Sequence, residues 1–170
     1  KIKPFQGYRP SPDMAASVSS PPYDVMTSEE ARGVAQINPF SFLRIIKPEI
    51  DFPSGDEPKG DALYKHGNTN LQTLISDGTL VQDENPCFYI YQIKMGDHTQ
   101  TGIMASVSVE EYNRGIIKKH EFTRPEKEDD RTHHIQITNA NTGPVFLTYR
   151  NDGQFQNKIS EIKNQSPDVS

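Results

Sequence analysis

The sequence predicts a soluble α+β fold (mixed α/β), with a mixed sheet of about five to six strands and about three to four helices. Its 170 residues have the length of one ordinary domain. Segments with helical periodicity alternate irregularly with strand-like segments, and no apolar run approaches the length of a membrane span. We therefore expect a single α/β domain over residues 1–150. Residues 151–170 would be a polar C-terminal extension or the truncated start of further structure.

The first third of the chain is expected to contain two strands and a helix. Residues 1–10 alternate apolar and polar side chains, as a short strand does. Prolines exclude a helix from residues 11–23. Thr27 and Glu30 then have the spacing of a capping box, which predicts a helix ending at about residue 36. Residues 41–47 are rich in apolar side chains and are expected to form a buried strand.

The middle of the chain contains the strongest helical pattern and a hairpin pattern. In residues 61–77 the apolar side chains recur at helical spacing, and Gly78 supplies a C-terminal stop. Residues 87–95 and 99–109 are strand-like, and residues 96–98 between them suit a hairpin turn.

The last third is expected to contain two helices and a returning strand. Ser108 and Glu111 have capping-box spacing and predict a short helix. Residues 123–126 repeat this spacing, with a proline in the first turn, and so predict a helix over residues 123–135. Residues 143–149 are expected to return as a strand.

The charge balance and the single cysteine limit the class of function. The formal net charge is -5, which disfavours both nucleic acid and an anionic membrane surface as partners. Cys87 is the only cysteine, so the sequence excludes an intrachain disulfide and a multi-cysteine metal site. We expect Cys87 to be a buried, inert thiol in a cytoplasmic protein. Nothing in the sequence predicts the oligomeric state.

The predicted helix over residues 123–135 carries an unusual charge pattern. At about 100° per residue, four side chains share one side of it: Arg124, Lys127, Arg131 and His134. A helix N-terminus attracts anions, and Thr123 and Lys119 lie near it in the sequence. Two interpretations stay open. Either the helix is simply solvated and held by ion pairs to Glu128 and Asp130, or its cations bind a phosphate or a carboxylate.

The pair that precedes this helix, His120 and Glu121, could act as acid and base or bind a divalent metal. Strand alternation would, however, point the two side chains to opposite faces. No set of residues with metal-ligand spacing stands out beyond them.

Two loops offer weaker candidates. The rigid elbow at residues 21–24 could present Tyr23 and Asp24 to a pocket, although an ordinary turn is the alternative. The polar loop that contains Asn141 and Thr142 could donate backbone N–H groups to an anion, although it could equally be a plain connection.

Several of these segments together resemble one known family. The segments are residues 4–5, 9–10, 21–25, 38–39, 41–43, 48–51, 100–103, 118–121, 123–124, 127–128, 130–131 and 140–146. Through them the chain is similar, from about residue 3 to residue 149, to the bacterial and archaeal family catalogued as domain of unknown function 1015. Members of that family are usually longer, so the resemblance implies that this chain is an N-terminal portion.

The function that this resemblance implies is limited, because the family has no assigned activity. A role around serine and phosphoserine has been suspected. The loop and Arg-bearing helix are also similar to the ParB and sulfiredoxin-like superfamily. Some of its members bind nucleotide phosphates at that helix, and one branch phosphorylates free serine. The paired arginines of the ParB motif are absent here.

We therefore expect small-molecule phosphoryl transfer, by a phosphoserine phosphatase or a free-serine kinase-like enzyme. The small anionic metabolite would be its partner, with Mg²⁺ and a nucleotide as cofactors. The alternative is a non-catalytic module that binds or senses an anionic metabolite. The expected catalytic residues are His120, Glu121 and Asp24. The expected anion-binding residues are Arg124, Lys127, Arg131, His134, Thr123 and Lys119. The expected supporting residues are Tyr23, Glu128, Asp130, Asn141 and Thr142.

Overall fold

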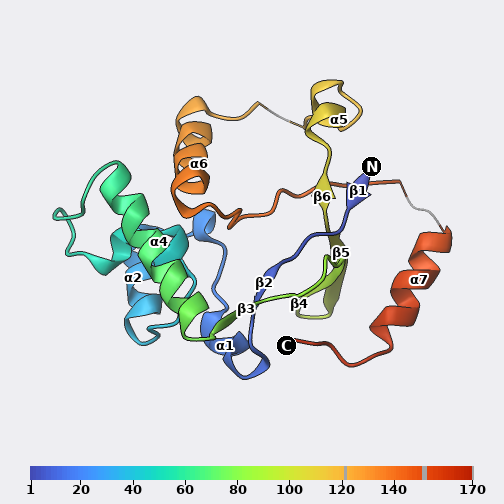
Figure 1. Ribbon diagram of the computed structural model, residues 1–170, viewed down its shortest axis with the longest axis horizontal. Helices are drawn as coiled ribbons and strands as arrows, with labels where there is room; N and C mark the ends of the chain where they lie inside the picture. Colours follow the sequence, from blue (N-terminus) through green and yellow to red (C-terminus); the bar gives the residue numbers. More distant parts are fainter. Residues whose placement is uncertain (121, 151–152, 170) are drawn as a thin grey trace. The chain divides into compact units, whose positions relative to one another are not determined.

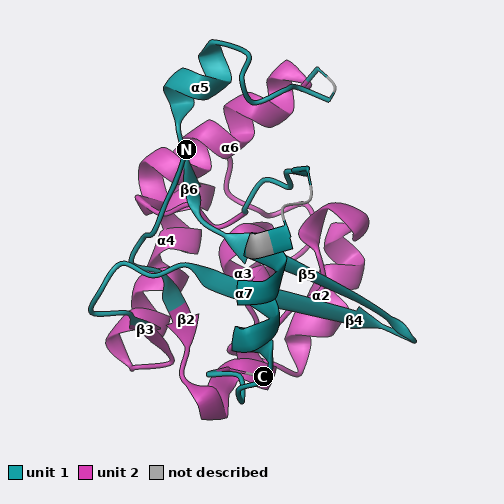
Figure 2. Cartoon of the chain, turned by 90° about the vertical axis from the view of Figure 1, so that its right-hand side faces the viewer, with its two compact units in different colours: residues 1–8, 82–122, 144–168 teal, residues 9–81, 123–143, 169–170 magenta. Residues whose placement is uncertain are grey.

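The chain divides into two compact units, which Figure 2 shows in different colours. Figure 1 labels the helices and strands along the chain. The computed structural model describes residues 1–120, 122–150 and 153–169. Unit 1 contains Lys1–Tyr8, Gln82–Phe122 and Pro144–Asp168. Unit 2 contains Arg9–Val81, Thr123–Gly143 and Val169–Ser170. No helix in the described residues combines the length and the apolar character needed to cross a membrane.

Unit 2 is mainly helical. Its helices are η1 (Pro12–Met14), α1 (Ala15–Val18), η2 (Tyr23–Val25), α2 (Ser28–Gln36), α3 (Leu43–Ile46), η3 (Pro48–Asp51), α4 (Asp61–Ser76) and α6 (Pro125–Thr138). The strands β2 (Tyr8–Pro10) and β3 (Leu80–Gln82) form a two-stranded sheet, and most of their residues belong to this unit.

Two apolar clusters form the core of unit 2, and the short helix α3 contributes to both. The first cluster contains Val18, Ile45, Leu71, Leu74 and Leu80. The second contains Ala31, Ala35, Leu43, Ile46 and Ile50. The prediction of a buried strand over residues 41–47 was therefore right about burial and wrong about conformation. A short apolar run does not distinguish a strand from a helix that is buried on all sides.

Unit 1 contains short antiparallel pairings and two helices. Strand β1 (Ile2–Lys3) pairs with β6 (Ser106–Val107), and β4 (Tyr89–Met95) pairs with β5 (His98–Met104). The helices are α5 (Val109–Asn113) and α7 (Gly153–Lys163), and α7 lies within the predicted polar extension.

The prediction of one mixed sheet with about five to six strands was wrong. In the described part of the chain the strands form separate two-stranded antiparallel sheets. Residues 144–150 adopt no regular secondary structure, so the strand expected over residues 143–149 does not form. Cys87 is exposed rather than buried. The α+β class itself is confirmed.

Several predictions that depended on local signals were confirmed. The exclusion of a helix from residues 11–23 was wrong, because η1 and α1 form there. Thr27 and Glu30 form a reciprocal capping box at the start of α2, and Ser108 caps α5. The helix predicted over residues 61–77 is α4, and Gly78 follows it with a φ of 80°. The predicted hairpin joins β4 to β5, with Met95 opposite His98.

Candidate functional site

The start of α6 differs from the predicted capping box. Its N-cap is Arg124, and no side chain caps the helix. The Thr123 hydroxyl instead donates a hydrogen bond of 2.7 Å to the Glu128 carboxylate. The Arg124 carbonyl accepts from the backbone N–H groups of Lys127 and Glu128, at 2.9 and 3.1 Å. These two N–H groups are therefore already bonded within the helix.

The guanidinium of Arg131 is held from two sides. Its Nε and Nη2 both donate to Oδ2 of Asp130, at 2.9 and 2.6 Å. The guanidinium carbon also lies 4.9 Å from the centre of the Tyr23 ring, a cation–π contact. The structure thus brings the elbow at residues 21–24 and the cationic helix α6 together within unit 2. No hydrogen bond or ion pair to Nη1 is seen among the described residues.

A tyrosine of α4 completes this group. The Tyr64 hydroxyl donates a hydrogen bond of 2.7 Å to Oδ1 of Asp130, the oxygen that Arg131 leaves free. Burial, together with this hydrogen bond, raises the pKa of Tyr64 to about 12. Burial alone would raise the pKa of Asp130. The hydrogen bonds from Tyr64 and Arg131 and the charge of Arg131 outweigh it, so the pKa of Asp130 lies below its ordinary value.

The other two basic residues at the start of α6 are exposed. Arg124 pairs with Glu126 at 2.5 Å, in an ion pair whose partners both face solvent. Such surface pairs contribute little stability, on the order of 0–1 kcal/mol. Lys127 is exposed, and in the described part of the chain no carboxylate lies within ion-pair distance of its Nζ. Lys127 and Arg131 are four residues apart, so they share one face of the helix.

His134 lies in the interior of unit 2, at 1% exposure. Its Nε2 lies 3.0 Å from the Ile45 carbonyl, and its Nδ1 lies 3.5 Å from the Thr142 hydroxyl. Burial lowers its pKa, so the neutral ring is favoured. This position suits a residue that joins α6 to α3, and we leave His134 out of the anion site proposed below. Asn141, beside Thr142, is exposed.

The remaining predicted residues do not all fall in unit 2. Asp24 is exposed in η2, next to Tyr23. His120 and Lys119 belong to unit 1, where the Lys119 ammonium lies 4.6 Å from the centre of the Tyr112 ring. Glu121 lies outside the described residues. An acid and base role for His120 and Glu121 therefore stays a prediction.

Sequence reasoning missed the role of Tyr64. Tyr64 lies in the helix predicted over residues 61–77, whose apolar periodicity accounts for the ring of Tyr64 but not for its hydroxyl. A tyrosine on the inner face of a helix usually needs a hydrogen-bond partner. This need for a hydrogen-bond partner was the signal in the sequence that could have indicated a polar contact for Tyr64.

A second polar cluster, centred on Asp51, was also missed. Its carboxylate accepts from Arg44, from His66 Nε2 at 2.8 Å and from Asn70 Nδ2 at 2.9 Å. His66 and Asn70 are four residues apart on α4, a spacing that could have indicated a shared partner. The cluster joins η3, α3 and α4.

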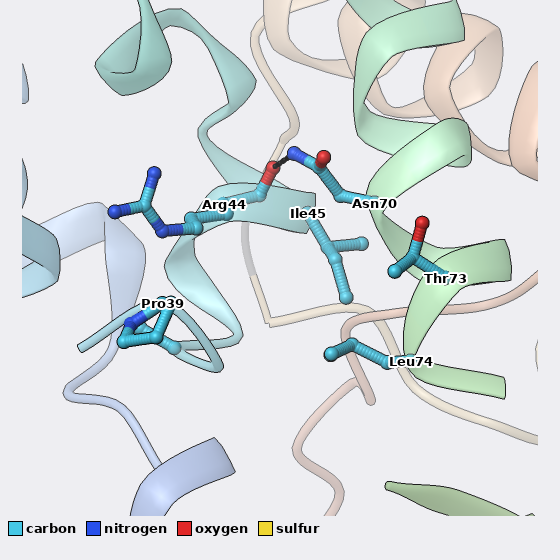
Figure 3. Close-up of a pocket in the computed structure, with 7 residues that line it drawn as sticks. Pro39, Arg44, Ile45, Asn70, Thr73 and Leu74 are labelled. Carbon is cyan, nitrogen blue, oxygen red and sulfur yellow. Dashed lines mark hydrogen bonds between the residues drawn. The ribbon is translucent and has the colours of Figure 1, made fainter. Parts of the chain in front are cut away.

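The arrangement around this cluster indicates a structural role. Figure 3 shows the adjoining hollow, in which the Arg44 carbonyl faces the Asn70 amide while the guanidinium of Arg44 turns away. That guanidinium donates to the Ala35 carbonyl at 2.8 Å and also binds Asp51. Within the described chain, no buried side-chain polar atom lacks a partner. The fully buried polar atoms of the cluster are therefore all hydrogen-bonded within the protein.

No group of three or more His, Cys, Asp or Glu side chains that could hold a metal ion occurs among the residues that the structure describes.

Comparison with known proteins identifies the family and nothing finer. No match was found among curated proteins or among solved structures. The suggested similarity to the ParB and sulfiredoxin-like superfamily therefore has no support. The family described as "Protein of unknown function (DUF1015)" matches residues 2–170. The chain belongs to this family.

Proposed function

We propose that unit 2 binds a small anionic metabolite, most simply a phosphate ester, against Arg131 and Lys127 on α6. One observation carries this proposal: the Arg131 guanidinium is fixed between the Tyr23 ring and the Asp130 carboxylate. An arginine that is already positioned loses less conformational entropy when a ligand binds.

The hydrogen-bonding capacity of this arginine supports the proposal. Asp130 uses Nε and Nη2, so the Nη1 side of the guanidinium can donate to a ligand oxygen. Two N–H groups of a guanidinium match the spacing of two oxygens of a phosphate or a carboxylate. The ammonium of Lys127, one helical turn away, can add a second donor and a further positive charge.

The surrounding charges set a limit on affinity. Asp130 offsets the charge of Arg131, and the first turn of α6 also carries Glu126 and Glu128. The net attraction for an anion is therefore modest, and we expect a Kd on the order of 0.1–1 mM. Such an affinity fits a metabolite that is abundant in the cell, which agrees with the cytoplasmic location expected from the sequence.

Phosphoryl transfer is the sharper form of this proposal. The same cations would stabilise the charge of the transferred group. Asp24 would help to orient Mg²⁺ or the cations, with a nucleotide as phosphoryl donor. The geometry of α6 favours binding more directly than it favours catalysis, so a non-catalytic or regulatory module is the form that we propose first.

The test is a titration of the whole chain with inorganic phosphate and with phosphoserine, in which calorimetry or NMR measures the Kd. We expect Arg131→Ala to abolish measurable binding and Lys127→Ala to weaken it about 3- to 10-fold. Arg114→Ala is the matched control, because Arg114 forms an exposed i,i+4 ion pair with Glu110 in unit 1. Equal affinity in the wild type and in Arg131→Ala would remove the proposal.

Catalysis is tested separately. Phosphoserine hydrolysis, and serine phosphorylation with ATP or ADP in the presence of Mg²⁺, would be measured for the wild type and for Arg131→Ala. Turnover that disappears in the variant would support phosphoryl transfer. Binding without turnover would leave the non-catalytic module.

A further inference from the structure

The Asp130–Arg131 pair has a geometry that an isolated helix would not favour. The two residues are neighbours on α6, and neighbouring helical side chains point about 100° apart. The guanidinium nevertheless reaches back to Asp130 with two donors. Contacts from outside α6 reach both residues: Tyr64 binds Asp130, and the Tyr23 ring lies against Arg131.

We propose that Tyr64 is a positioning residue, which holds Asp130 so that Asp130 in turn aims Arg131 at the ligand. This inference rests on the proposed function, and it assigns a role in the site to α4.

The contacts around Asp130 divide its two oxygens between two partners. Tyr64 donates to Oδ1 at 2.7 Å, whereas both nitrogens of Arg131 bind Oδ2. The hydrogen bond to Oδ1 restrains rotation of the carboxylate about its own axis. The oxygen that Arg131 needs is thereby kept on the Arg131 side. The Tyr23 ring lies against the guanidinium, whose carbon is 4.9 Å from the ring centre.

The packing of Tyr64 makes the hydroxyl separable from the ring. The ring lies 6.1 Å from the His134 ring, edge to face, and 6.3 Å from the His133 ring, nearly parallel. A phenylalanine can keep these contacts. Tyr64→Phe therefore removes the hydrogen bond to Asp130 while it preserves the packing of α4 against α6.

The experiment combines a binding measurement with a direct view of Arg131. The Nε–H signal of Arg131 would be recorded by ¹⁵N NMR and assigned with Arg131→Lys. We expect Tyr64→Phe to broaden or shift this signal even without ligand. We also expect it to raise the Kd for inorganic phosphate about 3- to 10-fold. In the Arg131→Lys background the same change should leave the Kd unaltered, because the group that it positions is gone.

Tyr89→Phe supplies the control, because the Tyr89 hydroxyl also donates to an aspartate, Asp83, at 2.7 Å in unit 1. The Tyr89 hydroxyl also accepts from the Gly7 N–H, so this variant loses stability in unit 1 without moving the Arg131 signal or the Kd. An unchanged Arg131 signal in Tyr64→Phe would overturn the inference, and so would an equal loss of affinity in both Arg131 backgrounds. A wild type that does not bind phosphate would instead refute the proposed function, while the Arg131 signal would still decide whether Tyr64 positions it.

Discussion

The two units of the chain differ in how they bury apolar surface. Unit 2 contains both core clusters, and its buried apolar residues come from distant parts of the sequence. In unit 1, among the described residues, the only buried apolar side chain is Ile159. The β4–β5 hairpin of unit 1 instead exposes Tyr91, Ile93 and Met95. These residues occupy every second position of β4 and so lie on one of its faces.

This difference in burial indicates which unit can hold the side chains of a binding site in fixed positions. A two-stranded hairpin with an exposed apolar face is only marginally stable by itself. Unit 2 has the burial needed to hold side chains in fixed positions. The fixed guanidinium of Arg131 lies in unit 2, whereas His120 belongs to unit 1.

The largest expected effect comes from matched truncations in the two units. Ile45 is fully buried in the first core cluster, so Ile45→Ala should lower the free energy of unfolding by about 2–5 kcal/mol. Ile93 is half exposed on the hairpin, so Ile93→Ala should change it by less than about 0.5 kcal/mol. Urea unfolding followed by circular dichroism measures both. Similar losses of unfolding free energy in the two variants would show that the hairpin is buried in solution, and would contradict the contrast between the two units.

The second effect is a pH dependence that belongs to unit 2. Burial lowers the pKa of His134 in the folded state below the ordinary value of about 6.5. The unfolded chain therefore takes up a proton first as the pH falls. His134 thus contributes stability above about pH 6.5 that is lost progressively below it.

This effect is measured as the difference in urea midpoint between pH 7.5 and pH 5. The wild type should lose more stability over this interval than His134→Gln, in which the titrating group is absent. His98→Gln, a change of an exposed histidine in unit 1, should behave like the wild type. An identical pH dependence in His134→Gln and the wild type would contradict the assignment.

The smallest effect compares the two helix caps. Thr27 accepts a hydrogen bond from the Glu30 N–H at the start of α2, and Ser108 accepts one from the Glu111 N–H at the start of α5. Thr27→Ala should cost about 0.5–2 kcal/mol, because α2 packs into a core cluster and unfolds with it. Ser108→Ala should cost less in the main transition. Thermal unfolding of the two variants checks the order, and a larger loss for Ser108→Ala would reverse it.

Much of the local structure in both units could be predicted where the signal was local. The start of α2, the extent of α4 and the β4–β5 turn followed from spacing within a few residues. Of the predicted site, Tyr23, Asp130 and Arg131 do meet in unit 2. Their partner Tyr64 was missed, because its contact with Asp130 spans 66 residues of sequence. No local pattern records such a pairing.

The sequence by itself determined the family, the α+β class, the capped starts of α2 and α5, and the position of cations along α6. These properties depend on residue identity and short spacings, which the chain carries in any environment. Only the tertiary structure decided that the segment at residues 41–47 is the helix α3, that His134 is buried against Ile45, and that Arg131 lies on Tyr23. Each of these depends on which distant surface covers a side chain, and packing of the whole unit selects that surface.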